Sequence, residues 1–203
     1  MDKILLIGAG GHSRSCIDVV EAENKFYIAG LIEKNNKKNE ESFRYPIIGT
    51  DDDLKNFRKK YTNALISVGQ IKSPEIRVKL YELLKELNFT LPVIYSPKSY
   101  VSKYSVIGEG SIIMHSVIVN INAQIGKNCI INNNALIEHD AFIGNHCHIA
   151  TGAIINGEVS VGHSTFIGSG AIVKQGISIG NNCVIGAGVI LKSDINSNQV
   201  LKN

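Results

Sequence analysis

The chain has 203 residues, of which 44% are hydrophobic and 19% charged, so it can bury a substantial core and is not disordered. Its 21 basic and 18 acidic residues nearly cancel and are scattered, which argues against a nucleic-acid-binding face. The early apolar stretch Ile4 to Ile7 is too short to cross a bilayer and precedes no signal-peptide cleavage pattern, so we expect a cytoplasmic protein without a membrane partner. The four cysteines form no CxxC pair, and no disulfide scaffold is indicated.

The first 90 residues predict alternating strands and helices. We expect strands over 3–7, 26–32 and 64–68, helices over 13–23, 51–60 and 75–87, and a polar loop over 35–41. Such alternation implies a parallel sheet covered by helices. The order strand, glycine loop, helix, strand at the start resembles a truncated Rossmann fold.

A glycine-rich loop, Gly8-Ala9-Gly10-Gly11-His12, joins the first expected strand to the first helix. Backbone N–H groups at a helix N-terminus bind phosphate, and glycines let the phosphate approach. Glu33 ends the second strand, where it could accept a hydrogen bond from a ribose hydroxyl. Ser13 replaces the third glycine of the dinucleotide fingerprint, and 90 residues are too few for the six-stranded dinucleotide fold. The loop is therefore either a nucleotide site, in which His12 donates to the ligand, or a tight turn without a ligand.

The segment Leu91–Tyr104, which contains Pro92 and Pro97, links this half to a very different one. We predict two domains, a Rossmann-like domain over 1–92 and a repeat domain over 93–203. Alternating strands and helices end before this segment, and a regular short repeat begins within it.

A six-residue repeat governs the second half, where sixteen consecutive hexads run from Tyr100 to Ile195. The second residue of every hexad is aliphatic, and the sixth is Ser, Thr, Ala, Cys, Val or Ile. This period is neither helical nor a strand alternation, and it fits a coil of short strands. Glycines recur every 18 residues, so three hexads complete one coil of a triangular prism, and we expect these glycines to turn its corners: Gly108, Gly126, Gly144, Gly162 and Gly180. Equivalent residues would then stack at the spacing of neighbouring strands, about 4.8 Å.

Three cysteines, Cys129, Cys147 and Cys183, occupy the small sixth position and are interpreted as core filler. The run His146-Cys147-His148 is a candidate metal motif. Neighbouring strand residues point to opposite faces, however, so we expect no metal there.

The hexad Leu136–Ala141 contains the best candidate for catalysis. His139 falls at or near a corner, and Asp140 follows it directly. A carboxylate next to an imidazole can fix its tautomer and stabilise the imidazolium, which makes a good general base. His148 lies half a coil further on and could reach the same region from a neighbouring face or subunit.

The whole chain resembles the hexapeptide-repeat sugar acyltransferases, which include N-acetyltransferases of nucleotide-linked 4-amino-4,6-dideoxy sugars and sialic acid O-acetyltransferases. The segments that carry the resemblance are 8–12, 45–49, 67–69, 136–140 and 154–157. The resemblance implies a small Rossmann-like domain followed by a left-handed parallel β-helix, an α/β plus all-β fold.

The resemblance also implies roles for individual residues. His139 takes a proton from the attacking sugar amine with the support of Asp140, while His148 lies near the thioester carbonyl and Asn132 near the acceptor group. Acetyl-CoA lies in a groove between β-helices of a homotrimer, with contacts at Gly157, Ser169, Gly186 and Ala187. The sugar nucleotide binds at Gly10, Gly11, His12, Glu33 and Gly69. The amine attacks the thioester directly, without an acyl-enzyme.

Three functions follow as hypotheses. The first is an acetyl-CoA-dependent N-acetyltransferase of a nucleotide-linked amino sugar, which the acid directly after His139 favours. The second is an O-acetyltransferase of sialic acid or a related sugar. The third is a β-helix without this activity, either a scaffold or a zinc protein with His139, His146 and His148 as ligands.

Overall fold

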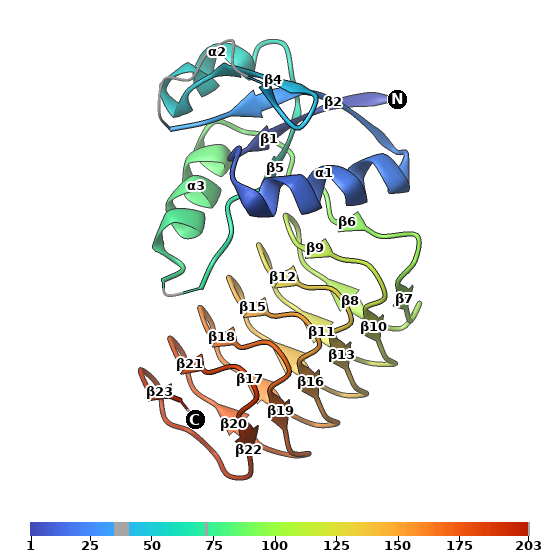
Figure 1. Ribbon diagram of the computed structural model, residues 1–203, viewed down its shortest axis with the longest axis vertical. Helices are drawn as coiled ribbons and strands as arrows, with labels where there is room; N and C mark the ends of the chain where they lie inside the picture. Colours follow the sequence, from blue (N-terminus) through green and yellow to red (C-terminus); the bar gives the residue numbers. More distant parts are fainter. Residues whose placement is uncertain (35–40, 72, 203) are drawn as a thin grey trace.

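The computed structural model places the chain in two parts, a helix-covered sheet above and a long coil of short strands below (Figure 1). The structure describes residues 1–34, 41–71 and 73–202. The upper part contains, in chain order, β1 (Asp2–Ile7), α1 (Gly11–Glu23), β2 (Phe26–Ile32), β3 (Glu41–Ser42), β4 (Tyr45–Gly49), the 3-10 helix η1 (Asp51–Asp53), α2 (Leu54–Phe57), β5 (Asn63–Ile66) and α3 (Glu75–Glu86). Within these ranges no helix has the length and apolar character that crossing a membrane requires.

The strands and helices expected in the first half are present, and apart from the helix expected over 51–60 their ends lie within two residues of the prediction. The helix expected over 51–60 is shorter and divided into η1 and α2. β4 was not predicted, because Pro46 near its start lacks an N–H donor and is unusual inside a sheet. The loop expected over 35–41 lies, except for Glu41, outside the described residues.

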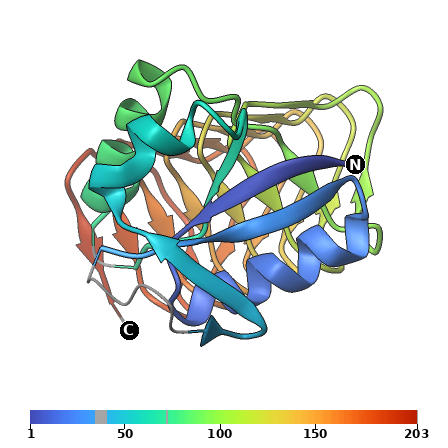
Figure 2. The same ribbon diagram turned by 90° about the horizontal axis from the view of Figure 1, so that it is seen from above.

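The upper sheet has the strand order β3-β4-β2-β1-β5, and every pair is parallel except β3 with β4. Side chains along β1, which lies between β2 and β5, alternate between two cores. Ile4 and Leu6 share a core with α1 and with the coil below, whereas Leu5 and Ile7 pack with residues of α2 and α3. Helix α1 thus lies between the sheet and the coil, and the sheet seen from above lies over the coil (Figures 1 and 2).

The lower part is a parallel β-helix built from two-residue strands. They are β6 (Ile94–Tyr95), β7 (Tyr100–Val101), β8 (Val106–Ile107), β9 (Ile112–Ile113), β10 (Ile118–Val119), β11 (Gln124–Ile125), β12 (Ile130–Ile131), β13 (Leu136–Ile137), β14 (Phe142–Ile143), β15 (His148–Ile149), β16 (Ile154–Ile155), β17 (Ser160–Val161), β18 (Phe166–Ile167), β19 (Ile172–Val173), β20 (Ser178–Ile179), β21 (Val184–Ile185), β22 (Ile190–Leu191) and β23 (Val200–Leu201). From β7 to β22 a strand begins every six residues, at the first residue of each predicted hexad. The predicted fold class is confirmed.

Each strand from β7 to β19 pairs with the strand 18 residues further along the chain, so one coil crosses three sheets. We name them the β7 face (β7-β10-β13-β16-β19-β22), the β8 face (β8-β11-β14-β17-β20) and the β6 face (β6-β9-β12-β15-β18-β21-β23). The chain runs from the β7 face to the β8 face and then to the β6 face. The corner between the β7 and β8 faces therefore lies opposite the β6 face.

The corners are turned by the fifth residue of the hexads and not by the stacked glycines, so that expectation was wrong. Asn122, Asn128 and Asp140 occupy this fifth position and have φ angles of 60°, 54° and 59°. Asn and Asp tolerate this left-handed conformation better than most residues. The stacked glycines at the third position serve another purpose, since a Cβ on Gly108 would lie 2.6 Å from the backbone carbon of Gly126 in the next coil.

The interior of the coil is filled as the repeat predicts. The aliphatic second positions and the small sixth positions are almost all buried, and Cys129, Cys147 and Cys183 have no exposed surface. The three thiols donate hydrogen bonds to carbonyl groups of the following coil, at 3.2 Å for Cys129 Sγ to Gly144 O. Their interpretation as core filler is confirmed.

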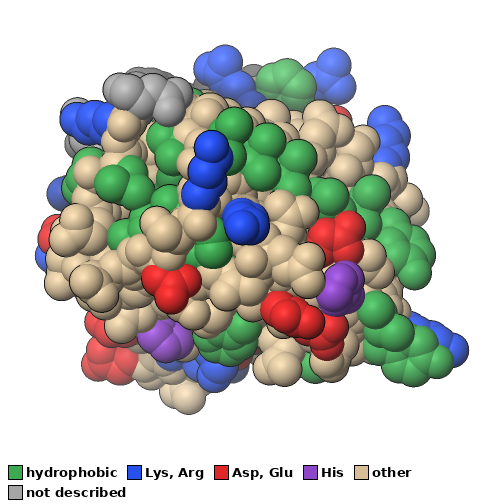
Figure 3. Space-filling model, turned by 90° about the horizontal axis from the view of Figure 1, so that it is seen from below, with side chains coloured by type: hydrophobic (Ala, Val, Ile, Leu, Met, Phe, Trp, Pro, Cys, Tyr) green, Lys and Arg blue, Asp and Glu red, His purple; other side chains and the backbone are tan. Residues whose placement is uncertain are grey.

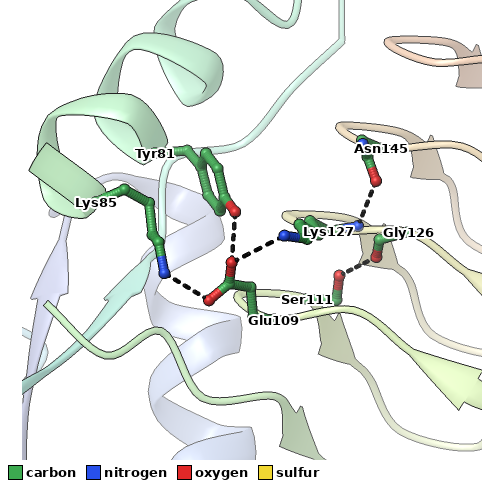
Figure 4. Close-up of polar contacts among 7 residues, drawn as sticks. All are labelled: Tyr81, Lys85, Glu109, Ser111, Gly126, Lys127 and Asn145. Carbon is green, nitrogen blue, oxygen red and sulfur yellow. Dashed lines mark hydrogen bonds and ion pairs between the residues drawn. The ribbon is translucent and has the colours of Figure 1, made fainter. Parts of the chain in front are cut away.

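The upper part docks on the β6 face and its edges, where polar contacts join α3 and α1 to the coil. Glu109 accepts hydrogen bonds from the Tyr81 hydroxyl and the Lys85 ammonium of α3, both at 2.8 Å, and pairs with Lys127 Nζ at 3.3 Å (Figure 4). The Lys85 hydrogen bond contributes most to lowering the pKa of Glu109 to about 2. At the other edge, Asp18 of α1 lies 2.7 Å from His115 Nε2. These contacts fix the upper part relative to the coil.

Replacing Glu109 by Gln should lower the free energy of unfolding by about 1 kcal/mol near neutral pH, because Gln loses both ion pairs in a partly exposed network. The folded-state pKa is depressed, so the carboxylate stabilises the fold above its unfolded pKa, near 4.5. This contribution disappears as the pH falls towards about 2. Urea denaturation at pH 7, 5 and 3 measures it.

The matched control is Glu86→Gln on the exposed side of α3, where the side chain has no polar partner among the described residues. It should leave stability nearly unchanged at every pH. A destabilisation by Glu109→Gln that is equally large at pH 7 and pH 3 would contradict the ionic origin of the effect.

Candidate functional site

The candidate base lies at the corner opposite the β6 face, where β13 ends and the chain turns toward β14. His139 Nδ1 and Asp140 Oδ2 are 2.8 Å apart, so the contact between these adjacent residues is present. An ionised carboxylate can only accept, and Nδ1 therefore carries the proton while Nε2 is left with a lone pair. The hydrogen bond to Asp140 raises the pKa of His139 above its usual value, and the nearby Glu138 and Glu158 act in the same direction.

Residues of the coils above and below surround this pair. Asn122 Nδ2 donates to Asp140 Oδ1 at 2.6 Å, and this hydrogen bond contributes most to lowering the pKa of Asp140. Glu138 Oε2 accepts from the His139 backbone N–H at 3.2 Å. Below, a Cβ on Gly157 would lie 2.7 Å from Cε1 and Nε2 of His139, so the imidazole lies directly against the glycine backbone. No hydrogen-bond acceptor faces the Gly157 N–H within the described chain.

The glycine loop forms a second candidate region in the upper sheet. Glu33 Oε2 accepts from the Ala9 N–H at 3.0 Å, and Oε1 accepts from the Lys34 N–H at 3.1 Å. The Glu33 carboxylate thus stabilises the glycine loop through its hydrogen bond with the Ala9 N–H. Gly10 and Gly11 open α1 with no side-chain cap on Gly10, and a Cβ on either glycine would meet no atom within 4 Å. Open backbone at a helix N-terminus suits an anion.

The half-buried His12 and the buried His148 lie where the loop approaches the β6 face. The rings of His12 and His148 are 6.5 Å apart at an angle of 41°. His148 Nδ1 donates to Gln70 O, and His148 Nε2 accepts from Asn132 Nδ2 at 3.3 Å. Gly69 closes this region, since a Cβ there would lie 3.3 Å from the His12 Cβ. The structure therefore brings four predicted residues together: His12, Gly69, Asn132 and His148.

Burial keeps both of these imidazoles neutral. Desolvation lowers the pKa of His12 to about 3 and that of His148 to about 4, and the charge of Arg77 adds to both effects. The Nε2 atom of His12 is buried and has no hydrogen-bond partner in the described part of the chain. An unpaired buried nitrogen is costly unless a ligand supplies its partner.

An open hollow of about 370 Å³ adjoins this pair. Gln70 and Phe166 line it, and Phe166 also packs edge-on against the His148 ring at 5.2 Å. Further lining residues come from the segment before α3 and from the coil, including Ser73, Ser164 and Asn182. The hollow therefore lies beside His148, which contacts two of its lining residues.

The remaining predicted contacts lie elsewhere. Ser169, Gly186 and Ala187 are at the corner between the β6 and β7 faces, where Gly188 N donates to Ser169 O at 2.9 Å. The predicted residues thus occupy three places: the upper part with the β6 face, the corner of His139 and Gly157, and this third corner. Within one chain, His139 and His148 do not share a cleft.

The zinc hypothesis finds no support in this arrangement. His146 Nδ1 accepts from Asn128 Nδ2 at 3.0 Å, and its ring packs edge-on against Tyr81. His139 stands at a different corner. Across residues 1–34, 41–71 and 73–202, no three His, Cys, Asp or Glu side chains are grouped so that they could hold a metal ion.

Arg77 is a buried residue of this region that the sequence did not indicate. Its guanidinium donates to Ile66 O and Val68 O at 2.9 and 2.7 Å, and to Asn128 Oδ1 at 2.7 Å. It therefore ties the end of β5, just before Gly69, to the coil. Burial lowers its pKa to about 10, so it remains charged at neutral pH.

Comparison with known families assigns both parts. Residues 3–84 match the family described as PglD N-terminal domain, and residues 158–193 match the hexapeptide repeat of succinyl-transferase. The first match covers most of the upper part, and the second covers the last coils of the β-helix. No curated protein matches the sequence.

Solved structures of the same architecture cover nearly the whole chain. The acetyltransferase domain of PglB from Neisseria gonorrhoeae FA1090, in complex with acetyl coenzyme A, is 27% identical with a TM-score of 0.89, over 98% of this chain and 94% of that one. PerB from Caulobacter crescentus, in complex with CoA and GDP-perosamine, is 27% identical with a TM-score of 0.90, over 99% and 95%. WeeI from Acinetobacter baumannii AYE, 23% identical with a TM-score of 0.85 over 100% and 98%, shares the fold.

Two further Caulobacter structures, described as perosamine N-acetyltransferase and GDP-perosamine N-acetyl transferase, contain CoA and GDP-perosamine and have a histidine replaced by Asn or Ala. Together with the PglD N-terminal domain and the repeats, these matches confirm the resemblance to the hexapeptide-repeat sugar acyltransferases.

Several residues around His139 were not predicted, although the hexapeptide repeat itself places them. Asn122 precedes Asp140 by 18 residues, and Asn120 precedes Glu138 by 18, with 2.9 Å between Asn120 Nδ2 and Glu138 Oε2. A search for polar residues separated by one coil would have found both pairs. No such period indicates Gln70 or Arg77.

Replacing Gly157 by Ala should displace the His139 imidazole. The Gly157 backbone is not left-handed, so it accepts Ala, and the histidine ring is the group that must move. We expect a crystal structure of the variant to show a shifted ring, with a change in free energy of unfolding below about 1 kcal/mol. A His139 ring that keeps its position in this variant would refute the close packing.

Proposed function

We propose that this protein is an acetyl-CoA-dependent N-acetyltransferase that acts on the 4-amino group of a nucleotide-linked amino-deoxy sugar. The observation that carries the proposal is the half-exposed His139, whose Nδ1 is held by Asp140 and whose Nε2 has no hydrogen-bond partner within the described chain. The likeness over nearly the whole chain to PerB, with CoA and GDP-perosamine bound, supports the substrate class.

His139 is the general base of this reaction. Its Nε2 accepts a proton as the sugar amine bonds to the acetyl carbon and the carbon–sulfur bond breaks, and the protonated imidazole returns that proton to the departing sulfur. Asp140 stabilises the imidazolium and keeps Nε2 directed outward. The Gly157 backbone lies against the His139 ring, and its N–H, which has no partner within the described chain, is our candidate donor to negative charge on the acyl oxygen.

The residues below His139 fit acetyl-CoA, which supplies an activated acetyl group. A hollow of about 400 Å³ lies on the β7 face, with Ile172 and Ile190 as apolar lining and with Lys174 and Lys192 beside them. The lower side of the molecule likewise shows hydrophobic side chains interspersed with Lys or Arg (Figure 3). An apolar floor suits the pantetheine arm, and two ammonium groups suit its phosphates. Ser169, Gly186 and Ala187 remain proposed contacts from another corner.

The sugar nucleotide binds to the upper part. Gly10 and Gly11 present open backbone to its phosphates, and the unpaired Nε2 of His12 gains a partner there. Glu33 and Gly69 border this region, and His148 with Asn132 lies below it on the β6 face. We propose that residues 1–92 form this binding domain and that residues 93–203 form the acyltransferase domain.

The two halves of the site require more than one chain. An acceptor bound beside His12 lies on the β6 face, whereas His139 of the same chain stands at the opposite corner. The β7 face exposes a row of stacked apolar residues, among them Tyr100 (60%), Ile118 (44%) and Ile190 (59%). A contact that pairs one corner with a different face of the next copy is heterologous and forms a ring when the rotation between copies closes. We propose that three copies close such a ring as a homotrimer.

Replacing His139 by Gln should reduce kcat by about 10²- to 10⁴-fold, the usual contribution of a general base, with little change in either KM. Release of free CoA thiol, measured with acetyl-CoA and a panel of nucleotide amino sugars, tests this. His163→Gln at another corner is the control and should keep full activity. Near-normal turnover by the His139 variant would refute its role as general base. Acetylation of free sialic acids and of no nucleotide amino sugar would refute the proposed acceptor class.

Replacing His12 by Ala should raise KM for the sugar nucleotide by about 10-fold or more, because a hydrogen bond to a charged phosphate is lost. The KM for acetyl-CoA and kcat should change little, since the proposed partner of His12 is a phosphate of the acceptor and not the reacting amine. The same thiol assay at varied acceptor concentration measures this. An unchanged acceptor KM would remove His12 from the site.

A further inference from the structure

We infer that Asn122 is a positioning residue for the His139–Asp140 pair, acting through the Asp140 carboxylate. The inference rests on the proposed function, because it concerns the same base. No family match or related structure assigns a role to this residue. The geometry that carries it is a chain of two hydrogen bonds that runs from one coil to the next.

Asn122 occupies the position of Asp140 in the coil above. Both residues stand at the fifth position of their hexads, with φ angles of 60° and 59°. Asn122 Nδ2 donates to Asp140 Oδ1 at 2.6 Å, and Asp140 Oδ2 accepts from His139 Nδ1 at 2.8 Å. Each oxygen of the Asp140 carboxylate therefore has one hydrogen-bond partner. The two partners together fix the rotation of the carboxylate.

Backbone hydrogen bonds between the coils hold Asn122 in place above Asp140. Asp140 N donates to Ile121 O at 3.2 Å, and β10 pairs with β13 in register on the same coils. The Asp140 side chain itself is 46% exposed. Without the Asn122 amide, water would compete for its oxygens and the carboxylate could rotate away from His139.

The contact between Asn122 and Asp140 could also serve only to stabilise the stacking of coils, because the β-helix contains another pair of stacked fifth-position side chains. Asn182 Nδ2 donates to Asn198 Oδ1 at 3.3 Å at a different corner. Neither side chain of that pair forms a hydrogen bond with a histidine in the described part of the chain. The two readings predict different effects on His139, which a titration can separate.

The charged groups that face His139 are Asp140, Glu138 and Glu158, all acidic. Glu138 is separately held by Asn120 at 2.9 Å and does not depend on Asn122. Loss of the Asn122 amide therefore acts on Asp140 alone. A carboxylate that turns away stabilises the imidazolium less, and the pKa of His139 falls toward its usual value.

The test compares Asn122→Gly with the matched control Asn134→Gly. Glycine keeps the left-handed backbone at both fifth positions and removes only the amide. Asn134 has a φ of 57°, is exposed, and makes no side-chain hydrogen bond within the described residues. Each variant is made in the full chain, alone and combined with Asp140→Gly, and thermal unfolding checks that it folds.

We expect Asn122→Gly to lower kcat by about 10- to 100-fold, the usual effect of misplacing a catalytic group, and to leave both KM values nearly unchanged. In the Asp140→Gly background the same substitution should have almost no further effect, since its path to His139 is already lost. The NMR titration of the His139 ring should show a lower pKa than in Asn134→Gly.

A kcat and a His139 pKa equal to those of Asn134→Gly would overturn the inference. So would a full additional loss in the Asp140→Gly background, which would show that Asn122 acts independently of the carboxylate. The NMR titration needs no substrate. If the unaltered protein transfers no acetyl group, the proposed function fails, while the titration still decides whether Asn122 controls the His139–Asp140 pair.

Discussion

The pairing of each strand from β7 to β19 with the strand 18 residues further is the constraint on which the site depends. It places Asn122 above Asp140, Asn120 above Glu138, and His139 above Gly157. A shift of one residue in this register would turn the aliphatic second positions outward, so the buried core holds the register. The geometry around His139 is therefore fixed by core packing that involves none of the residues around it.

Different positions within one hexad likewise meet different structural requirements. The third-position glycines allow neighbouring coils to approach, because a Cβ on Gly126 would meet Gly144 at 2.7 Å. The fifth positions take the left-handed conformation, which favours Asn, Asp and Gly. Asp140 satisfies the backbone requirement and also orients His139. The chain gains a carboxylate at a turn position without disturbing the repeat.

The limits of prediction from sequence follow from the same constraint. The hexads, the 18-residue coil and the contact between His139 and Asp140 could be read because they are periodic or local. The prediction that the stacked glycines turn the corners was wrong, since an 18-residue spacing alone does not distinguish a turn from a close approach of neighbouring coils. The docking of the upper part could not be read, because Arg77 with Asn128 and Gln70 with His146 are separated by 51 and 76 residues and follow no period.

The histidines show why the environment and not the residue type assigns the roles. His12 of the upper part and His148 of the β6 face lie where these two parts meet, and desolvation there lowers both pKa values far below the physiological range. Both imidazoles stay neutral at physiological pH. Each can donate one hydrogen bond and accept another, but neither can hold a second proton. His139 stands among three carboxylates at an exposed corner, and its pKa is raised. Among these three imidazoles, only the one at His139 is placed to hold a proton taken from an amine.

The separation of these environments also explains why the proposed site spans two chains. A buried, neutral pocket suits recognition of the acceptor, because hydrogen bonds in a desolvated site are strong and specific. A base that must become charged needs carboxylates and partial access to water, which a buried pocket excludes. One prism cannot provide both at one point, since the β6 face is covered by the upper part and the opposite corner is not. In the proposed assembly the open corner of one copy meets the covered face of the next, and the two requirements are met together.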